Sequence, residues 1–159
     1  MIDLLNNKES IVNFINRFFV AVDDRNWPIV QRQFAPEVVL DYSSMGAGPA
    51  GTVRPEEIIT EWKKLLPGFD NTHHQVGNHV IEHSQNNTTV VCYATASHYL
   101  YNDSGDHIWR VVGTYNFEIA PNEHNKWRIH LLRFNLKFTE GNELLPEIAK
   151  KKIKESTVS

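Results

Sequence analysis

Four histidines fall within twelve residues of this sequence, in the stretch THHQVGNHVIEH at positions 72–83. His79 and His83 stand four residues apart, a spacing that would suit zinc if the stretch were a helix. The alternation of its side chains predicts a strand instead, and four residues of strand span about 13 Å. Two such imidazoles cannot share one ion through bonds of about 2 Å. We therefore expect no metal site here, and we consider proton transfer.

The alternation divides the stretch between two faces of the predicted strand. One face carries His74, Val76, Asn78 and Val80, and the other carries His73, Gln75, Gly77, His79, Ile81 and His83. The second set is mostly polar, so we expect it in solvent or at an interface. A bulge at Gly77 would change the register beyond that position. His74, which precedes Gly77 on the more apolar face, is the histidine expected to point inside.

The next predicted strand places another histidine among small side chains. Its inward set is Val90, Cys92, Ala94, Ala96, His98 and Leu100. The small residues beside His98 leave room for a ligand. Cys92 lies about 20 Å from His98 along a strand, so the two cannot form a nucleophilic pair, and Cys92 is expected in the core. For either inward histidine, the competing interpretation is a core imidazole bonded to a carbonyl group.

Tyr42 and Asp23 complete the set of candidate residues. Tyr42 shares the inward face of a short predicted strand with Val38 and Leu40. Asp23 lies at the C-terminal end of a predicted helix that would cover the sheet. A buried carboxylate without a partner costs several kcal/mol, so Asp23 needs a partner if it is inside. The alternative is an ordinary helix-end residue in water, as we expect for Asp24.

Helical spacing of apolar residues and turn-like composition predict the elements that position these side chains. Helices are expected at 8–24, capped by Asn6 or Asn7, in a short segment with Pro28 in its first turn and Phe34 near its end, from Pro55 to Pro67, and at 142–155. Strands are expected at 37–42 and, as an antiparallel meander, at about 72–83, 88–101, 107–119 and 127–138. Residues 43–51 are expected to form a loop.

This order of elements favours an α+β fold in which helices pack on one face of a curved sheet. We expect one domain over residues 1–159, with a core at about 8–138 and a C-terminal tail at 139–159. The tail holds the lysine-rich run 150–154, which is typical of a solvated helix face.

The composition excludes several kinds of partner. The 159 residues carry a net charge of −3, which disfavours nucleic acid or an anionic membrane surface as a partner. No apolar stretch approaches the roughly 20 residues of a membrane-spanning helix, and the N-terminus lacks the pattern of a signal peptide. The single cysteine allows no internal disulfide. We expect a cytoplasmic protein.

Five short motifs, taken in order, resemble the SnoaL-like branch of the nuclear-transport-factor-2-like superfamily. They are VDDRNW (22–27), VLDYSS (39–44), THHQVGN (72–78), ASHYLY (96–101) and WRI (127–129). Within this branch the sequence is most similar to the scytalone dehydratases, over roughly residues 8–138. The resemblance implies a cone-shaped, strongly curved mixed or antiparallel sheet, packed against the N-terminal helices and enclosing a pocket.

The resemblance also implies roles for four residues. Asp23 would pair with His74, fix the tautomer of its imidazole and stabilise the imidazolium. His74 would then abstract a proton, His98 would protonate a departing hydroxide, and Tyr42 would donate to a carbonyl oxygen. No cofactor is required by this chemistry. One departure is Val22, which occupies the position of a tyrosine in the scytalone dehydratases and leaves their tyrosine pair incomplete.

Six further residues are expected to line the substrate pocket. They are Phe14, Phe18, Trp62, Asn78, Thr114 and Asn116, and the register of the later strands leaves the choice between Thr114 and Asn116 open. Members of the superfamily form dimers or trimers, so we expect a homo-oligomer. Its interface would lie on the outer face of the sheet, with Trp109 or Trp127.

The favoured function is therefore a cofactor-free lyase, a dehydratase acting on a small cyclic or aromatic molecule. Two alternatives stay open, because a fold does not assign a reaction. The first is a non-catalytic domain that binds a small ligand or dimerises, in which Asp23 and His74 are not bonded or the pocket is filled by side chains. The second is an isomerase or an epoxide hydrolase on the same scaffold, the latter with Arg110 or Arg133 in an Asp-Arg-Asp set.

Overall fold

A computed structural model describes residues 8–158, which form four α-helices, two short 3-10 helices and one six-stranded sheet. The helices are α1 (Lys8–Asp23), α2 (Trp27–Gln33), α3 (Pro55–Lys63) and α4 (Leu145–Ser156), with 3-10 turns η1 (Ser43–Met45) and η2 (Leu66–Gly68). The strands are β1 (Phe34–Asp41), β2 (Gly51–Val53), β3 (Asn71–His83), β4 (Thr88–Tyr99), β5 (Ile108–Pro121) and β6 (Trp127–Gly141). None of the helices in this part of the chain is both long and apolar enough to cross a membrane.

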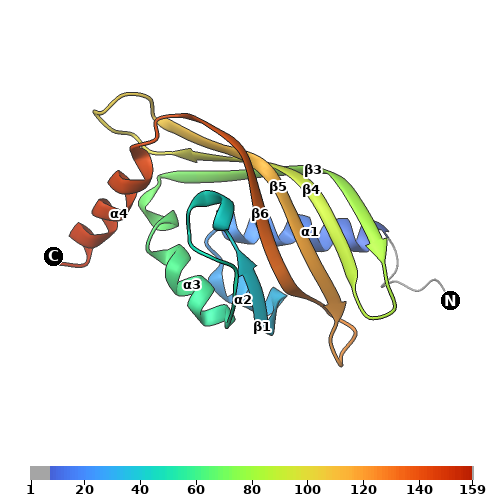
Figure 1. Cartoon of the computed structure of the whole chain (residues 1–159). Helices are drawn as coiled ribbons and strands as arrows, with labels where there is room; N and C mark the ends of the chain where they lie inside the picture. The colour runs from blue at the N-terminus through green and yellow to red at the C-terminus, as the bar shows by residue number, and fades with distance from the viewer. Residues whose placement is uncertain (1–7, 159) are drawn as a thin grey trace.

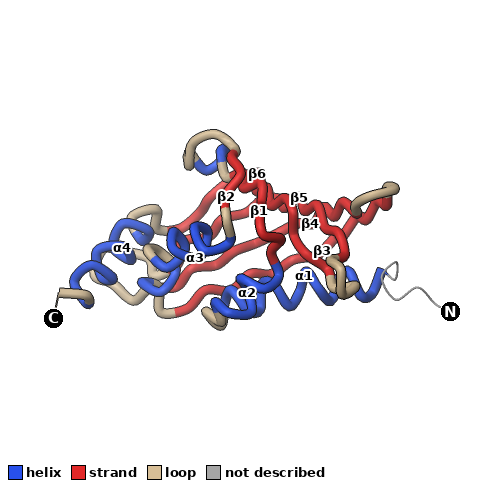
Figure 2. The backbone as a smooth tube through the Cα atoms, turned by 90° about the horizontal axis from the view of Figure 1, so that it is seen from below, coloured by secondary structure: helices blue, strands red, loops and turns tan. Residues whose placement is uncertain are grey.

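The sheet is mixed, in the strand order β2-β1-β6-β5-β4-β3. Strands β3 to β6 form the predicted antiparallel meander, and β1 pairs with β6 in parallel. Helices α1, α2 and α3 lie along one face of the sheet, and α4 lies at one of its ends (Figures 1 and 2). The α+β prediction is therefore confirmed. The sheet is open, with β2 and β3 at its edges.

The apolar face of α1 forms the centre of the core, as its helical spacing predicts. Phe18 is almost fully buried, and its ring meets Phe34, Trp62 and Phe117 edge-on at centroid distances of 5.5, 6.2 and 6.0 Å. Edge-to-face aromatic contacts of this kind add to the stabilisation that burial provides. The packing holds α1 across the inner face of the sheet, with its C-terminal end close to β3.

Two predicted boundaries are wrong. The first strand begins at Phe34 and not at residue 37, because Phe34, which is also the C-cap of α2, has an extended backbone that pairs with Ile129 of β6. The predicted loop at 43–51 contains η1 and the first residue of β2, which pairs with Leu40 of β1. The expected cap, Asn6 or Asn7, lies outside the described residues. The expected tail contains the end of β6 and all of α4.

A bulge in β3 changes the predicted register after Gly77. The pairing with β4 shifts between Gly77 and Val80, and Asn78 adopts a left-handed backbone with φ +54°. Asn78 is consequently exposed, and Ile81 instead of Val80 packs against the core. The expected position of Asn78 on the inner face is wrong for this reason, whereas His74, which precedes the bulge, keeps its predicted face.

We predict that Phe117→Ala lowers the free energy of unfolding by about 3–5 kcal/mol, the usual cost of emptying a fully buried phenylalanine site. Phe117 is completely buried and contacts the rings of Phe18, Phe19 and Tyr115. Phe138→Ala is the matched control, because Phe138 is 52% exposed, and it should cost less than about 1 kcal/mol. Urea unfolding measures both values, and equal losses would contradict this description of the core.

Candidate active site

Asp23 and His74 form a hydrogen-bonded pair between the last residue of α1 and strand β3. His74 Nδ1 lies 2.7 Å from Asp23 Oδ1, and the backbone N–H of His74 donates to Oδ2 at 2.7 Å. The hydroxyl of Thr72 donates to Oδ1 at 3.0 Å. The side chains of His74 and Asp23 are only 8% and 16% exposed. Two donors thus hold the carboxylate against the strand in addition to the imidazole.

These contacts keep Asp23 ionised. Burial acts to raise its pKa, but the hydrogen bonds and charge of His74, with the Thr72 hydroxyl, lower the pKa below its usual value. An ionised carboxylate accepts only, so His74 must carry its hydrogen on Nδ1. In the neutral ring, the second nitrogen, Nε2, carries no hydrogen and can accept a proton.

Arg25 fixes the chain immediately after this carboxylate. Its backbone is left-handed, with φ 55°, and its guanidinium donates to the carbonyl oxygens of Phe69 at 2.5 Å and Leu66 at 3.3 Å. The end of α1 is therefore tied to η2 and to the segment that leads into β3. This connection places Asp23 beside Thr72 and His74.

His98 lies in a different environment 6.1 Å from the His74 ring, centre to centre. Its ring packs against Phe69 at 4.9 Å and Trp109 at 4.7 Å. Its Nδ1 is 3.2 Å from the carbonyl oxygen of Trp109, an acceptor, so Nδ1 carries the hydrogen. Burial, aided by the nearby His74, lowers the pKa of His98 to about 4. At neutral pH, His98 is therefore an uncharged acceptor through Nε2, which does not suit the expected role as proton donor.

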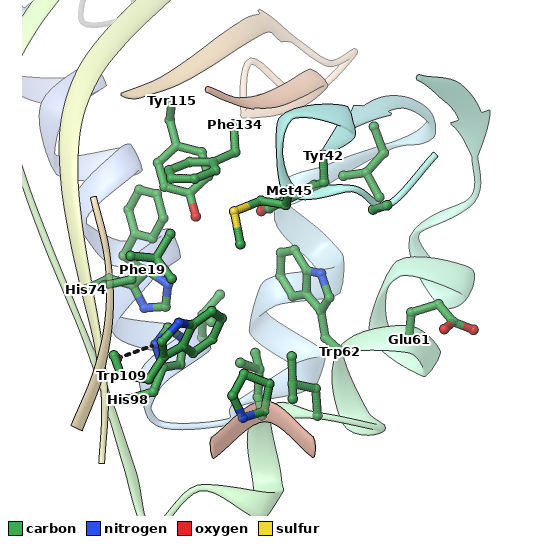
Figure 3. A pocket seen from close by; sticks show the side chains of 18 of the residues that line it. Phe19, Tyr42, Met45, Glu61, Trp62, His74, His98, Trp109, Tyr115 and Phe134 are labelled. Atoms are coloured by element: carbon green, nitrogen blue, oxygen red, sulfur yellow. Dashed lines mark hydrogen bonds between the residues drawn. The ribbon is translucent and has the colours of Figure 1, made fainter. Parts of the chain in front are cut away.

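Both histidines line a cavity of about 690 Å³ (Figure 3). Most of its wall is apolar and aromatic, and it is lined by Phe18, Phe19, Val22, Leu40, Tyr42, Met45, Gly46, Ala47, Glu61, Trp62, Leu65, Leu66, His74, Ala96, His98, Trp109, Val111, Tyr115, Phe134, Pro146 and Lys150. Its size lies within the range of small-molecule sites. Phe18 and Trp62 line it as expected. Phe14, also a residue of α1, does not line the cavity and packs against the hydrophobic core instead.

Tyr42 shares the wall of this cavity with a second tyrosine, Tyr115 of β5. Both labelled side chains lie on the side of the cavity where Phe134 and Met45 are found (Figure 3). Burial raises the pKa of Tyr42 to about 12 and the pKa of Tyr115 well above its usual value. Both phenols are therefore neutral at pH 7 and retain their O–H donors. The chain thus has a tyrosine pair in spite of Val22.

Tyr115 was missed by sequence reasoning because the wrong face of β5 was chosen. The inward residues are Val111, Gly113, Tyr115, Phe117 and Ile119, and they alternate without interruption. Thr114 and Asn116 point to the other face, where the amide of Asn135 donates to both. Their expected place in the pocket is therefore wrong. The apolar alternation from Val111 to Ile119 was the signal that could have identified Tyr115.

Residues far from the predicted site also contribute to the cavity wall. Met45, Gly46 and Ala47 come from η1 and the loop after it, and Pro146 and Lys150 come from α4. Both tryptophans expected on the outer face are inside: Trp109 lines the cavity, and Trp127 is buried in the core. The expectation that either tryptophan lies at a subunit interface is wrong for this reason.

The remaining candidates, which are a nucleophilic cysteine, a metal site and an arginine-based hydrolase site, are not supported by the geometry of the described residues. Cys92 is fully buried in the core, and burial raises its pKa to about 12, so it is an unreactive thiol. Within residues 8–158, no three histidine, cysteine or acidic side chains come together in a way that could hold a metal ion. Arg133 pairs with Asp41 at 2.8 Å and Arg110 pairs with Glu140, and neither arginine lines the cavity.

This combination of fold and pocket is that of the nuclear-transport-factor-2-like class, also described as cystatin-like. Within this class, the chain belongs to the SnoaL-like domain family, which matches residues 3–133. No curated protein matches the sequence.

Solved structures share the fold over most of the chain. The Kfla4162 protein of Kribbella flavida superposes with a TM-score of 0.81 at 20% identity, over 93% of this chain and 99% of its own. A provisionally assigned scytalone dehydratase of Novosphingobium aromaticivorans gives 0.69 at 13% identity, over 84% and 85%. A hexachlorocyclohexane dehydrochlorinase of Novosphingobium barchaimii gives 0.68 at 13% identity, over 84% and 88%. At these identities, the likeness establishes the fold.

We predict that Thr72→Val raises the pKa of Asp23, because a hydrogen bond to the charged form is lost. Thr72→Ser is the control, since it keeps the hydroxyl that donates to Oδ1. Carbon-13 NMR titration of the Asp23 carboxyl group measures the change. An identical titration in Thr72→Val and the wild type would show that the hydroxyl does not hold the carboxylate.

We predict that the protein loses stability as the pH falls from about 6.5 to about 4, partly through His98. The folded-state pKa of His98 is about 4, against an ordinary value of 6.5. The unfolded chain therefore takes up this proton first, and folding is penalised by on the order of 3 kcal/mol once the pH is below both values. Urea unfolding of the wild type and His98→Gln at several pH values measures the effect. The variant should lose less stability as the pH falls. Parallel plots of unfolding free energy against pH for the two proteins would contradict the prediction.

Proposed function

We propose that the protein is a cofactor-free lyase that eliminates water from a small cyclic or aromatic molecule. The observation that carries this proposal is the Asp23–His74 hydrogen bond, which leaves His74 Nε2 as a base beside a largely apolar cavity. A carboxylate-oriented imidazole suits the removal of a proton from carbon. Many of the lining side chains are aromatic, which suits a flat ring as the substrate.

In the proposed reaction, His74 Nε2 takes a proton from a carbon of the substrate. The electron pair of the broken C–H bond forms the new double bond, and the hydroxyl group leaves with the electrons of its C–O bond. Asp23 stabilises the imidazolium that this transfer produces, because the carboxylate already faces Nδ1–H. The positive charge therefore rests on His74 until its proton passes to the departing hydroxide.

The tyrosine pair and His98 form hydrogen bonds with the oxygen atoms of the substrate. A neutral phenol of the Tyr42–Tyr115 pair donates to a substrate oxygen on which negative charge grows. His98 accepts a hydrogen bond from a substrate hydroxyl through Nε2. Since neutral His98 has no proton on Nε2 and its Nδ1–H is bonded to the Trp109 carbonyl, the His74 imidazolium is the group that returns a proton to the departing hydroxide.

The structural neighbours support an elimination in general terms. One is provisionally a scytalone dehydratase, and another is a hexachlorocyclohexane dehydrochlorinase. The tyrosine pair favours a substrate with an oxygen acceptor, and hence loss of water, over a halogenated hydrocarbon. The binding-domain alternative is less well supported, because it requires an unbonded Asp23 and His74 or a filled pocket. The hydrolase alternative lacks an arginine in the cavity wall.

We predict that Asp23→Asn and His74→Ala each lower kcat for dehydration by about 10²–10⁴-fold, the usual contribution of a general base. The assay is a screen of cyclic β-hydroxyketones, followed by absorbance of the conjugated product. Tyr93→Phe is the control, because Tyr93 is exposed and does not line the cavity. If both variants turn over an identified substrate at the wild-type rate, the proposal fails.

A further inference from the structure

Helix α4 is packed against η2 through unusually close backbone contact. A Cβ atom added at Gly68 would lie 2.2 Å from the carbonyl oxygen of Ala149, so no larger residue fits while α4 keeps its place. Leu145 and Ala149 are fully buried and join Phe69 and Leu100 in a second apolar cluster, separate from the main core. The helix is thus held by its own small core at one end of the sheet (Figures 1 and 2).

Polar contacts fix both ends of the same helix. The backbone N–H of Asn142 donates to the carbonyl oxygen of Ile108 at 2.8 Å, and its side-chain amide donates to that of Asp106 at 3.0 Å. Further along, Lys152 pairs with Asp70 at 2.8 Å. The small cluster therefore has a defined position relative to the β4–β5 turn and to the start of β3.

The α4 cluster reaches the catalytic pocket through two aromatic rings that touch His98. Phe69, a member of the cluster, contacts the imidazole at 4.9 Å, and Trp109, which packs against the cluster, contacts it at 4.7 Å. On its other side, α4 places Pro146 and Lys150 in the cavity wall. The helix thus backs the rings that enclose His98 and also borders the space in front of it.

We infer that docked α4 is a working part of the site, in which Gly68 and Ala149 are positioning residues that keep water from His98. With α4 in place, Phe69 and Trp109 stay against the ring, and the Trp109 carbonyl keeps Nδ1–H engaged. His98 then presents Nε2 to the ligand as a neutral acceptor. The catalytic importance of α4 docking rests on the proposed function, but the shielding of His98 from water does not.

Two charged side chains near His98 shift its pKa in opposite directions. His74 on β3 lowers the pKa of His98, and Asp23 on α1 raises it. Neither group is on α4, so both remain when the helix undocks. The helix contributes Lys150 to the cavity wall, but Lys150 is paired with Glu147 of the same helix at 2.8 Å, so both charges leave together. Burial is the largest cause of the lowered pKa of His98, and the bond to the Trp109 carbonyl is a smaller contribution that raises this pKa. Entry of water on undocking should therefore raise the pKa of His98.

Gly68→Ala tests the inference, because the new methyl group cannot fit under Ala149. Gly51→Ala is the matched control: a Cβ at Gly51 has no atom within 4 Å and no positive φ to oppose it. Proton NMR would follow the His98 ring resonance, identified by its loss in His98→Gln, and hydrogen exchange would follow the amides of α4. In Gly68→Ala we expect faster exchange in α4 and a pKa of His98 raised by at least about one unit. Gly51→Ala should match the wild type in both.

Leu145→Ala provides a second route if Gly68→Ala fails to fold, because it weakens the same cluster without touching η2. Faster α4 exchange with an unchanged pKa of His98 in either variant would overturn the inference, and so would wild-type exchange in both. These readouts need no substrate. Failure here is therefore distinct from failure of the proposed reaction, which the turnover of Asp23→Asn and His74→Ala decides.

Discussion

The site depends on one buried carboxylate at an unfavourable place. Asp23 ends α1, where the aligned peptide dipoles present partial negative charge, and no basic residue lies in the last turn of that helix. Its ionised form persists because β3 supplies three hydrogen bonds, from Thr72 and from the ring and backbone of His74. These bonds constrain the distance and angle between α1 and β3, and Arg25 reinforces the constraint from the next turn. The cavity is the space that this fixed arrangement leaves between the helix and the sheet.

The same constraint gives two neighbouring histidines opposite chemistry. His74 faces a carboxylate, which stabilises a proton on its ring, whereas His98 faces a carbonyl group and two aromatic rings, which do not. With ring centres 6.1 Å apart, two imidazolium ions would repel each other in a cavity whose wall is largely apolar. At most one of the two rings can therefore carry a positive charge, and only His74 faces a carboxylate. Environments that drive the pKa values of like residues apart are a common basis for assigning acid and base roles.

Local sequence pattern was sufficient for the parts of this structure that depend on periodicity. The apolar face of α1, the four long strands and the inward direction of His74 and His98 follow from spacing alone. Pattern failed where a local irregularity or a distant contact decided the outcome. The bulge at Asn78 turned this expected lining residue outward. On β5, the polar residues Thr114 and Asn116 were expected in the pocket, whereas Tyr115 between them is the residue that lines it. The contribution of α4 depends on how Gly68 meets Ala149, residues 81 positions apart in numbering, and no local signal reports such a contact.

The Asp23–His74 pair is better explained by reactivity than by stability. Burying a charged pair costs desolvation energy that the mutual attraction only partly offsets, and apolar side chains of similar volume are often as stable. Here the surrounding wall is already aromatic, so a phenylalanine or leucine at either position would suit the core. What the pair provides instead is an imidazole held in one orientation, with Nδ1 directed at a carboxylate. Set beside a neutral acceptor, His98, and two neutral phenols, this arrangement supports the proposed reaction, which needs one base and a separate place for negative charge on a substrate oxygen.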